Sequence, residues 1–153
     1  SFLLFIVFWE IIVYYPLAHW IWGGGWLQQL GVLDFAGGIV IHTSSGASSL
    51  VMAYVLGHRQ EFDKYHGEFP PHNIPLAAIG TALLWMGWYG FNAGSALSAG
   101  TVASSTISAT TIASCVGVIV WSLLSLLRNR RVYTVAVLNG AIAGMAGITP
   151  VAG

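Results

Sequence analysis

The chain has 153 residues, of which 56% are hydrophobic and only 7% carry a charge. A soluble domain of this size has roughly a quarter charged residues, so the composition excludes an ordinary soluble protein and predicts an all-α, polytopic transmembrane helix bundle. The net charge is zero and the strand-like alternation of a transmembrane β-barrel is not seen, so we expect neither a nucleic-acid partner nor a barrel.

Five apolar segments are predicted to span the membrane. They cover about residues 1–15, 34–56, 73–93, 98–127 and 132 to beyond 153. Pro16 is expected to end or kink the first segment, because proline removes a helix hydrogen bond. Asn73 and Pro75 predict a cap and a first turn for the third segment. The first segment is shorter than the ~20 residues of a span and the chain does not begin with Met, so we expect an internal part of one longer membrane domain.

The basic residues predict the orientation of the chain. They are Arg59, Lys64, Arg128, Arg130 and Arg131. They fall only between the second and third segments and between the fourth and fifth. By the positive-inside rule these two loops face the cytoplasm. Trp22, Asp34 and the turn at 92–100 then face outward.

Two ionisable residues stand out in the second segment. Asp34 opens an otherwise apolar run, and His42 follows eight residues later. Ionisable groups in a bilayer are costly and by default indicate a pathway, a relay or a substrate site. On a helix the two would be about 12 Å apart along the axis, too far for a direct hydrogen bond.

Small residues are dense in the second segment, and residues 140–144 form a GxxxG pattern in the fifth. Small residues allow helices to approach closely. We expect this pattern to serve packing within the bundle rather than a specific dimer contact.

Five short motifs extend over almost the whole chain. They are PLAHWIWGGG at 16–25, DFAGG at 34–38 with His42, PHNIP at 71–75, GWYGFNAGSA at 87–96, and NGAIAG followed by GITP at 139–150. In this order and spacing they resemble the ammonium transporter family (Amt/Mep/Rh), and its Amt branch in particular. The resemblance implies an eleven-helix fold, a trimer with one pore in each subunit, and a chain that covers roughly helix four to the start of helix eight.

The resemblance also implies roles for residues at the outer end of the pore. Trp22 and Ser95 match the external site that recruits the cation, where an aromatic face and a hydroxyl acceptor bind it. Phe91 matches one of two stacked phenylalanines that close the pore, and Trp88 is expected in the pore wall. The other reading of Trp22 is an interfacial aromatic residue, that of Ser95 a helix cap, and that of Phe91 core packing.

His42 is the central candidate. It matches the first of two histidines that share a proton across the pore, and a neutral imidazole offers both a donor and an acceptor. Asp34 is expected either to stabilise the cation through its electrostatic field or to bind backbone amides near a helix start. The resemblance implies that its role is essential, whether structural or in deprotonation. Glu10 departs from the family pattern in the middle of the first segment, and we assign it no role.

The function implied is transport of ammonium, with methylammonium as an analogue, by recruitment, deprotonation and passage of ammonia through an apolar pore. A sensor of the same family is the alternative, and an intramembrane hydrolase using Asp34, His42 and Ser45 or Ser49 is a remote one. We expect no enzymatic activity, cofactor or metal. Expected partners are the lipid bilayer, two further copies in a homotrimer and a possible cytoplasmic regulatory protein, with the plasma membrane as location.

Overall fold

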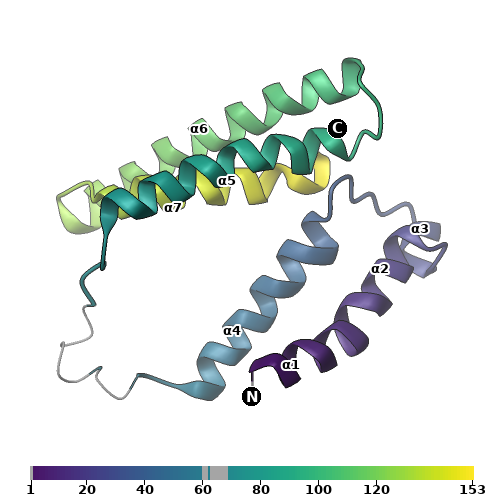
Figure 1. The fold of residues 1–153 in the computed structure, drawn as a ribbon, viewed down its shortest axis with the longest axis horizontal. Coiled ribbons are helices and arrows are strands. Elements are labelled where there is room, and N and C mark those ends of the chain that lie inside the picture. The colour runs from purple at the N-terminus through teal and green to yellow at the C-terminus, as the bar shows by residue number, and fades with distance from the viewer. Residues whose placement is uncertain (1, 60–61, 63–68) are drawn as a thin grey trace.

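The computed structural model describes residues 2–59, 62 and 69–153, and every regular element within them is a helix (Figure 1). The α-helices are α1 (Phe2–Trp9), α2 (Tyr15–Trp22), α3 (Trp26–Gln29), α4 (Ser44–Leu56), α5 (Ile74–Gly94), α6 (Thr101–Asn129) and α7 (Thr134–Ile148). Two π-helical turns, η1 (Glu10–Tyr14) and η2 (Gly38–Thr43), and one 3₁₀ turn, η3 (Thr149–Val151), join or extend them.

Five of the resulting helical stretches are long and apolar enough to cross a membrane. They are Phe2–Gln29, Gly38–Leu56, Ile74–Gly94, Thr101–Asn129 and Thr134–Val151. The predicted all-α class and the five spans are therefore confirmed. The predicted start of the third span is confirmed as well, since the Asn73 side chain accepts a hydrogen bond from the Leu76 amide at 2.8 Å.

The prediction that Pro16 could end the first span at about residue 15 is wrong. The helix continues through α2 to Trp22. In η1 the Tyr15 amide donates to the Glu10 carbonyl, five residues back, so the α-helical register restarts just before Pro16. Proline then falls in the first turn of α2, where its missing amide hydrogen is tolerated.

Two other predicted boundaries also differ. The second helix begins at Gly38, so Asp34 precedes it rather than opening it. Asn92 is a wholly buried residue of α5 and not part of the outer turn, which begins after Gly94. In the fifth span the α-helix gives way after Ile148 to the 3₁₀ turn η3, in whose first turn Pro150 is tolerated.

The closest packing is between α6 and α7. Gly117 of α6 lies against Gly140 and Gly144 of α7, where an added Cβ would collide with the facing backbone. The Ser114 hydroxyl also donates to the Ala141 carbonyl at 3.1 Å. The GxxxG pattern thus serves packing inside the bundle, as expected.

Helix α5 packs against both of these helices, and the α6–α7 connection lies at the same end of this group as the start of α5 (Figure 1). That end carries Arg128, Arg130 and Arg131 and follows the loop with Arg59. Lys64 lies outside the described residues. Assignment of this end to the cytoplasm remains a prediction.

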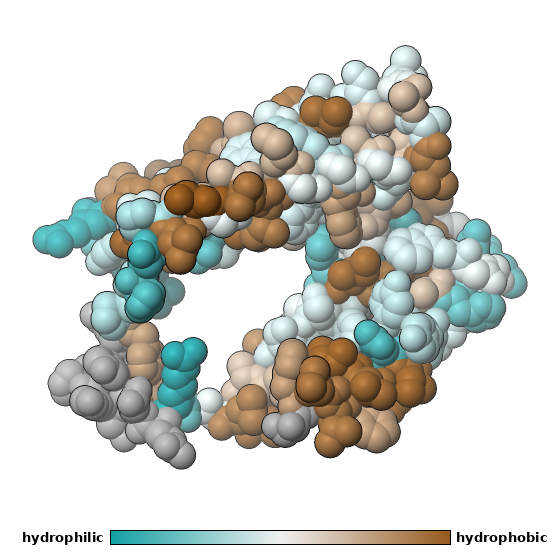
Figure 2. Space-filling model, in the orientation of Figure 1, coloured by the Kyte–Doolittle hydropathy of each residue, from teal (hydrophilic) through white to brown (hydrophobic). Residues whose placement is uncertain are grey.

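The distribution of polarity is the reverse of that in a soluble protein. Large apolar side chains are exposed along the spans, as Leu83 (69%) and Ile119 (65%) illustrate. Thr106, Thr110 and Ser114 of α6 are fully buried. Apolar surface covers much of the outside, and a broad opening lies between α4 and the α5–α7 group, which is in contact with η2 beside it (Figure 2). Such surfaces suit contact with lipid or with further helices.

Candidate functional site

The Asp34 carboxylate binds the start of the second span. Its Oδ1 accepts hydrogen bonds from the amides of Gly37 (2.9 Å) and Gly38 (2.7 Å). Its Oδ2 accepts from Ile39 (2.8 Å) and Val40 (2.9 Å). The residue is 7% exposed. An anion at a helix N-terminus satisfies amides that lack an intrahelical partner and is favoured by the helix dipole.

This arrangement uses the capacity of the carboxylate almost completely, since an ionised carboxyl group has about four acceptor sites. It also fixes the backbone that leads into η2, where Gly37 adopts a positive φ of 93° that glycine tolerates. The Gly37 carbonyl in turn accepts from the His42 amide at 3.2 Å. Hydrogen bonds therefore connect the Asp34 carboxylate to the His42 backbone through η2.

Trp22 lies beside Asp34 at the end of α2. Its indole Nε1 donates to the Asp34 backbone carbonyl at 2.8 Å, while the residue stays 44% exposed. The hydrogen bond fixes the edge of the Trp22 indole and leaves part of the ring exposed. An uncovered indole face attracts a cation by about 0.5–2 kcal/mol, depending on its desolvation.

His42, Trp88 and Phe91 form one aromatic cluster between η2 and α5. The His42 ring centroid lies 5.2 Å from that of Trp88 and 5.6 Å from that of Phe91, at interplanar angles of 31° and 28°. Trp88 and Phe91 are 5.8 Å apart. The spacing of three residues between Trp88 and Phe91 puts both rings on one side of α5, which explains how they meet a single imidazole.

A groove of about 380 Å³ runs along this cluster. Its lining consists of His42, Leu83, Leu84, Gly87, Trp88 and Phe91. The imidazole Nε2 is buried and has no hydrogen-bond partner in the described part of the chain. Buried polar atoms without partners are uncommon, so this nitrogen indicates a position where another group binds.

Ser95 caps the C-terminal end of α5, one turn beyond Phe91. Its hydroxyl donates to the Phe91 carbonyl at 2.8 Å. The hydroxyl hydrogen is thereby occupied, while lone pairs of the oxygen stay available to accept from a donor such as a cation. No hydrogen bond joins Ser95 to Trp22 among the residues described.

Thr149, which the sequence reasoning left without a role, contacts this cluster. Its Oγ1 accepts a hydrogen bond from Trp88 Nε1 at 3.1 Å. The next residue, Pro150, accepts from the Phe35 amide at 2.9 Å through its carbonyl. The only signal in the sequence was the Gly147–Pro150 motif, which shows that the segment matters but not what it touches.

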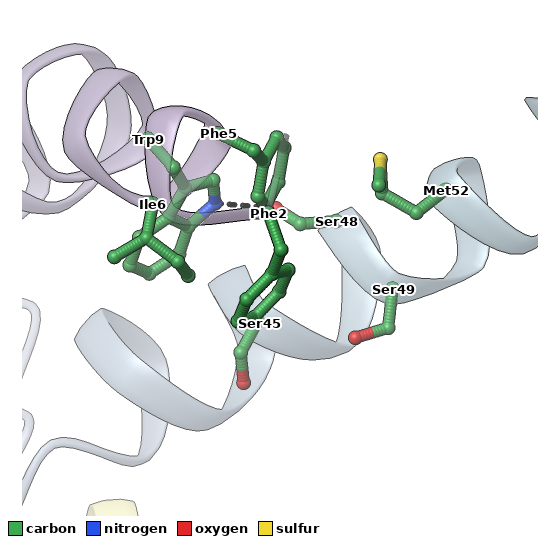
Figure 3. A pocket seen from close by; sticks show the side chains of 8 residues that line it. All are labelled: Phe2, Phe5, Ile6, Trp9, Ser45, Ser48, Ser49 and Met52. Atoms are coloured by element: carbon green, nitrogen blue, oxygen red, sulfur yellow. Dashed lines mark hydrogen bonds between the residues drawn. The ribbon is translucent and has the colours of Figure 1, made fainter.

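A second groove, of about 330 Å³, lies between α1 and α4 (Figure 3). Its side chains are Phe2, Phe5, Ile6, Trp9, Ser45, Ser48, Ser49 and Met52. Trp9 Nε1 donates to the Ser48 hydroxyl at 2.7 Å and so ties the first span to the second. The Ser45 hydroxyl donates to the His42 backbone carbonyl, not to the imidazole. These contacts give no support to a serine–histidine hydrolase site.

The structure thus brings together Trp22 with Asp34, and His42 with Trp88 and Phe91, and it places Ser95 one turn from Phe91. Five apolar membrane-length helices around these groups define an integral, multi-pass helical membrane protein.

The sequence model of the Ammonium Transporter Family matches residues 1–153, and the chain belongs to this family. It is 61% identical to ammonium transporter 1 of Dictyostelium discoideum over 154 residues, which cover 100% of this chain and 33% of that protein. The crystal structure of Candida albicans Mep2 matches with a TM-score of 0.87 and 41% identity, covering 98% of this chain and 34% of that one. A solved sensor Amt protein matches with a TM-score of 0.83 and 32% identity, covering 95% and 38%. The chain thus spans about a third of the length of these relatives.

Proposed function

We propose that this chain is the central part of an ammonium transporter and lines one side of its conduction pathway. The observation that carries the proposal is the buried, unpaired Nε2 of His42 beside an apolar groove, stacked on Trp88 and Phe91. A neutral imidazole can donate to or accept from a small polar molecule in an otherwise apolar passage.

The substrate class follows from this chemistry. Ammonium can lose a proton, whereas a metal cation cannot lose its charge to cross an apolar segment. The cation binds outside, releases a proton, and ammonia passes the rings of Phe91 and Trp88 and the imidazole of His42. The proton returns or crosses separately through the imidazole.

Recruitment is assigned to Trp22 and Ser95. The uncovered face of the Trp22 indole attracts the cation, and the Ser95 oxygen accepts one of its N–H groups. Because no direct bond links the two side chains, the assignment rests on an exposed ring and a free acceptor, each at the end of a helix.

Asp34 is assigned the structural role of the two that the sequence left open. With four amides bound to it, the carboxylate has almost no acceptor capacity left for a cation. It orients η2, and thereby His42.

We further propose that the chain is part of one longer membrane domain, which assembles as a homotrimer in the plasma membrane. Its length relative to the relatives and the broad opening in Figure 2 support further helices that complete the pore. A cytoplasmic regulatory protein would dock at the end that carries the arginine residues.

A sensor is the second candidate, favoured by the match to a sensor Amt protein. The two functions differ in flux. Uptake of labelled methylammonium by cells that express the full-length protein, with competition by ammonium, tests the first. Absence of uptake together with saturable ammonium binding by the purified protein would instead favour the sensor.

A further inference from the structure

Thr149 stands at the junction of α7 and η3 and is completely buried. Its hydroxyl donates to the Met145 carbonyl at 2.8 Å and accepts from the Trp88 indole at 3.1 Å. A hydroxyl has one hydrogen and two lone pairs, so one oxygen serves both contacts. The hydroxyl is therefore fixed by its own helix and in turn fixes a ring on another helix.

The η3 turn, which begins with Thr149, also contacts η2, the turn from which His42 lines the groove. Pro150 lies so close to Gly38 that an added Cβ would collide with the proline ring. Its carbonyl binds the Phe35 amide, and Gly38 is the first residue of η2, the turn that carries His42. The η3 turn thus contacts both elements whose side chains face each other in the groove.

We propose that Thr149 is a positioning residue, which sets the orientation of the Trp88 ring against the His42 imidazole. The inference rests on the proposed function. A tryptophan side chain rotates broadly about its second torsion angle, and a hydrogen bond to Nε1 selects one of those orientations. The orientation selected leaves the ring 5.2 Å from the imidazole and against Phe91. Loss of the bond frees the ring to turn into the passage.

The experiment compares three substitutions in the full-length transporter. Thr149→Val removes the hydroxyl at nearly constant shape, and Thr149→Ser keeps it. Thr106→Val is the matched control, because Thr106 is equally buried and donates to the carbonyl four residues back at 2.7 Å, yet has no indole partner in the part of the chain that the structure describes. Concentration-dependent methylammonium uptake is measured for each variant at equal surface expression.

Leaving a half-buried indole N–H unpaired is expected to lower the maximal uptake rate about fivefold or more in Thr149→Val. The KM should stay within about twofold, because the recruitment residues Trp22 and Ser95 are unchanged. The substitution is expected to slow the passage of substrate through the pore, and not its binding at the outer site. Thr149→Ser should restore the rate, and Thr106→Val should leave both values near wild type. An unchanged rate in Thr149→Val, or an equal loss in Thr106→Val, would overturn the proposal.

A second measurement is independent of transport. The indole N–H resonance of Trp88, assigned by its loss in Trp88→Phe, is expected to shift and to exchange faster with water in Thr149→Val but not in Thr106→Val. A resonance that does not move would refute the link between Thr149 and Trp88 even if uptake fell. If the wild-type protein takes up no methylammonium, the proposed function fails, and this resonance still decides the role of Thr149.

Discussion

Replacement of Asp34 by alanine should remove all four hydrogen bonds that bind the start of the second span. Hydrogen bonds to a charged group contribute about 1.5–3 kcal/mol each, so four independent bonds would contribute about 6–12 kcal/mol. The four share one carboxylate and are not independent. Asp34→Ala removes the charge and leaves neutral amides without an acceptor, at about 1–3 kcal/mol for each one that stays buried, so we expect a destabilisation of several kcal/mol.

The comparison variant is Asp34→Asn, which keeps the shape of the side chain. One amide oxygen can still accept from two backbone amides, but the NH₂ group then faces two N–H donors. Both variants should therefore lower the thermal midpoint of the detergent-solubilised full-length protein and abolish methylammonium uptake, since η2 no longer holds His42 in place.

The two measurements separate the two roles of Asp34. Loss of uptake at an unchanged thermal midpoint would refute the structural reasoning and would favour a direct part in deprotonation. Full uptake by Asp34→Ala would contradict both roles and with them the assignment of the site.

Three further predictions follow from the described contacts. His42→Ala should strongly reduce uptake or alter its selectivity, while His72→Ala at the exposed start of the third span should not; uptake and competition by potassium measure this. Asn73→Ala should lower stability by about 1 kcal/mol through loss of the cap, without loss of uptake, in thermal unfolding combined with transport. Gly144→Val should force α6 and α7 apart and impair assembly, whereas Gly147→Ala, with open space around it, should fold normally, as size-exclusion profiles would report.

The spans and the cap were accessible to sequence reasoning because their signals are local. Apolar runs locate five spans, although the first run is too short to give the length of its span, and Asn73 with Pro75 marks a helix start within four residues. The GxxxG pattern likewise predicts close packing from the spacing of small residues. Each of these conclusions depends on residues within one or two turns of each other.

The two π-helical turns were not accessible in the same way. Pro16 predicts a break, but the π-helical turn η1 precedes it and places Pro16 in the first turn of α2, so that the helix continues. Asp34 reads as the first residue of a span, yet its carboxylate binds amides three to six residues ahead. In both cases a shift in the backbone hydrogen-bond register, which leaves no mark in hydropathy, decides the boundary.

The bond between Trp88 and Thr149 joins residues 61 positions apart, and no local pattern encodes it. Tertiary packing alone brings the end of α7 against the middle of α5. This explains why the resemblance to a family could point to Trp88 but not to the Thr149 hydroxyl that binds its indole.

The buried polar groups of this chain divide by whether the chain itself satisfies them. Asp34 and Thr149 have partners for nearly all their capacity, as groups that maintain an architecture should. In the described residues two buried side-chain atoms lack partners, His42 Nε2 and Asn92 Oδ1. Asn92 is still bound to Thr110 within the α5–α6 contact, whereas the His42 ring borders a groove with aromatic walls. Of these two atoms, the imidazole nitrogen is the one whose ring borders a groove, and this is why the proposed conduction pathway is placed at His42.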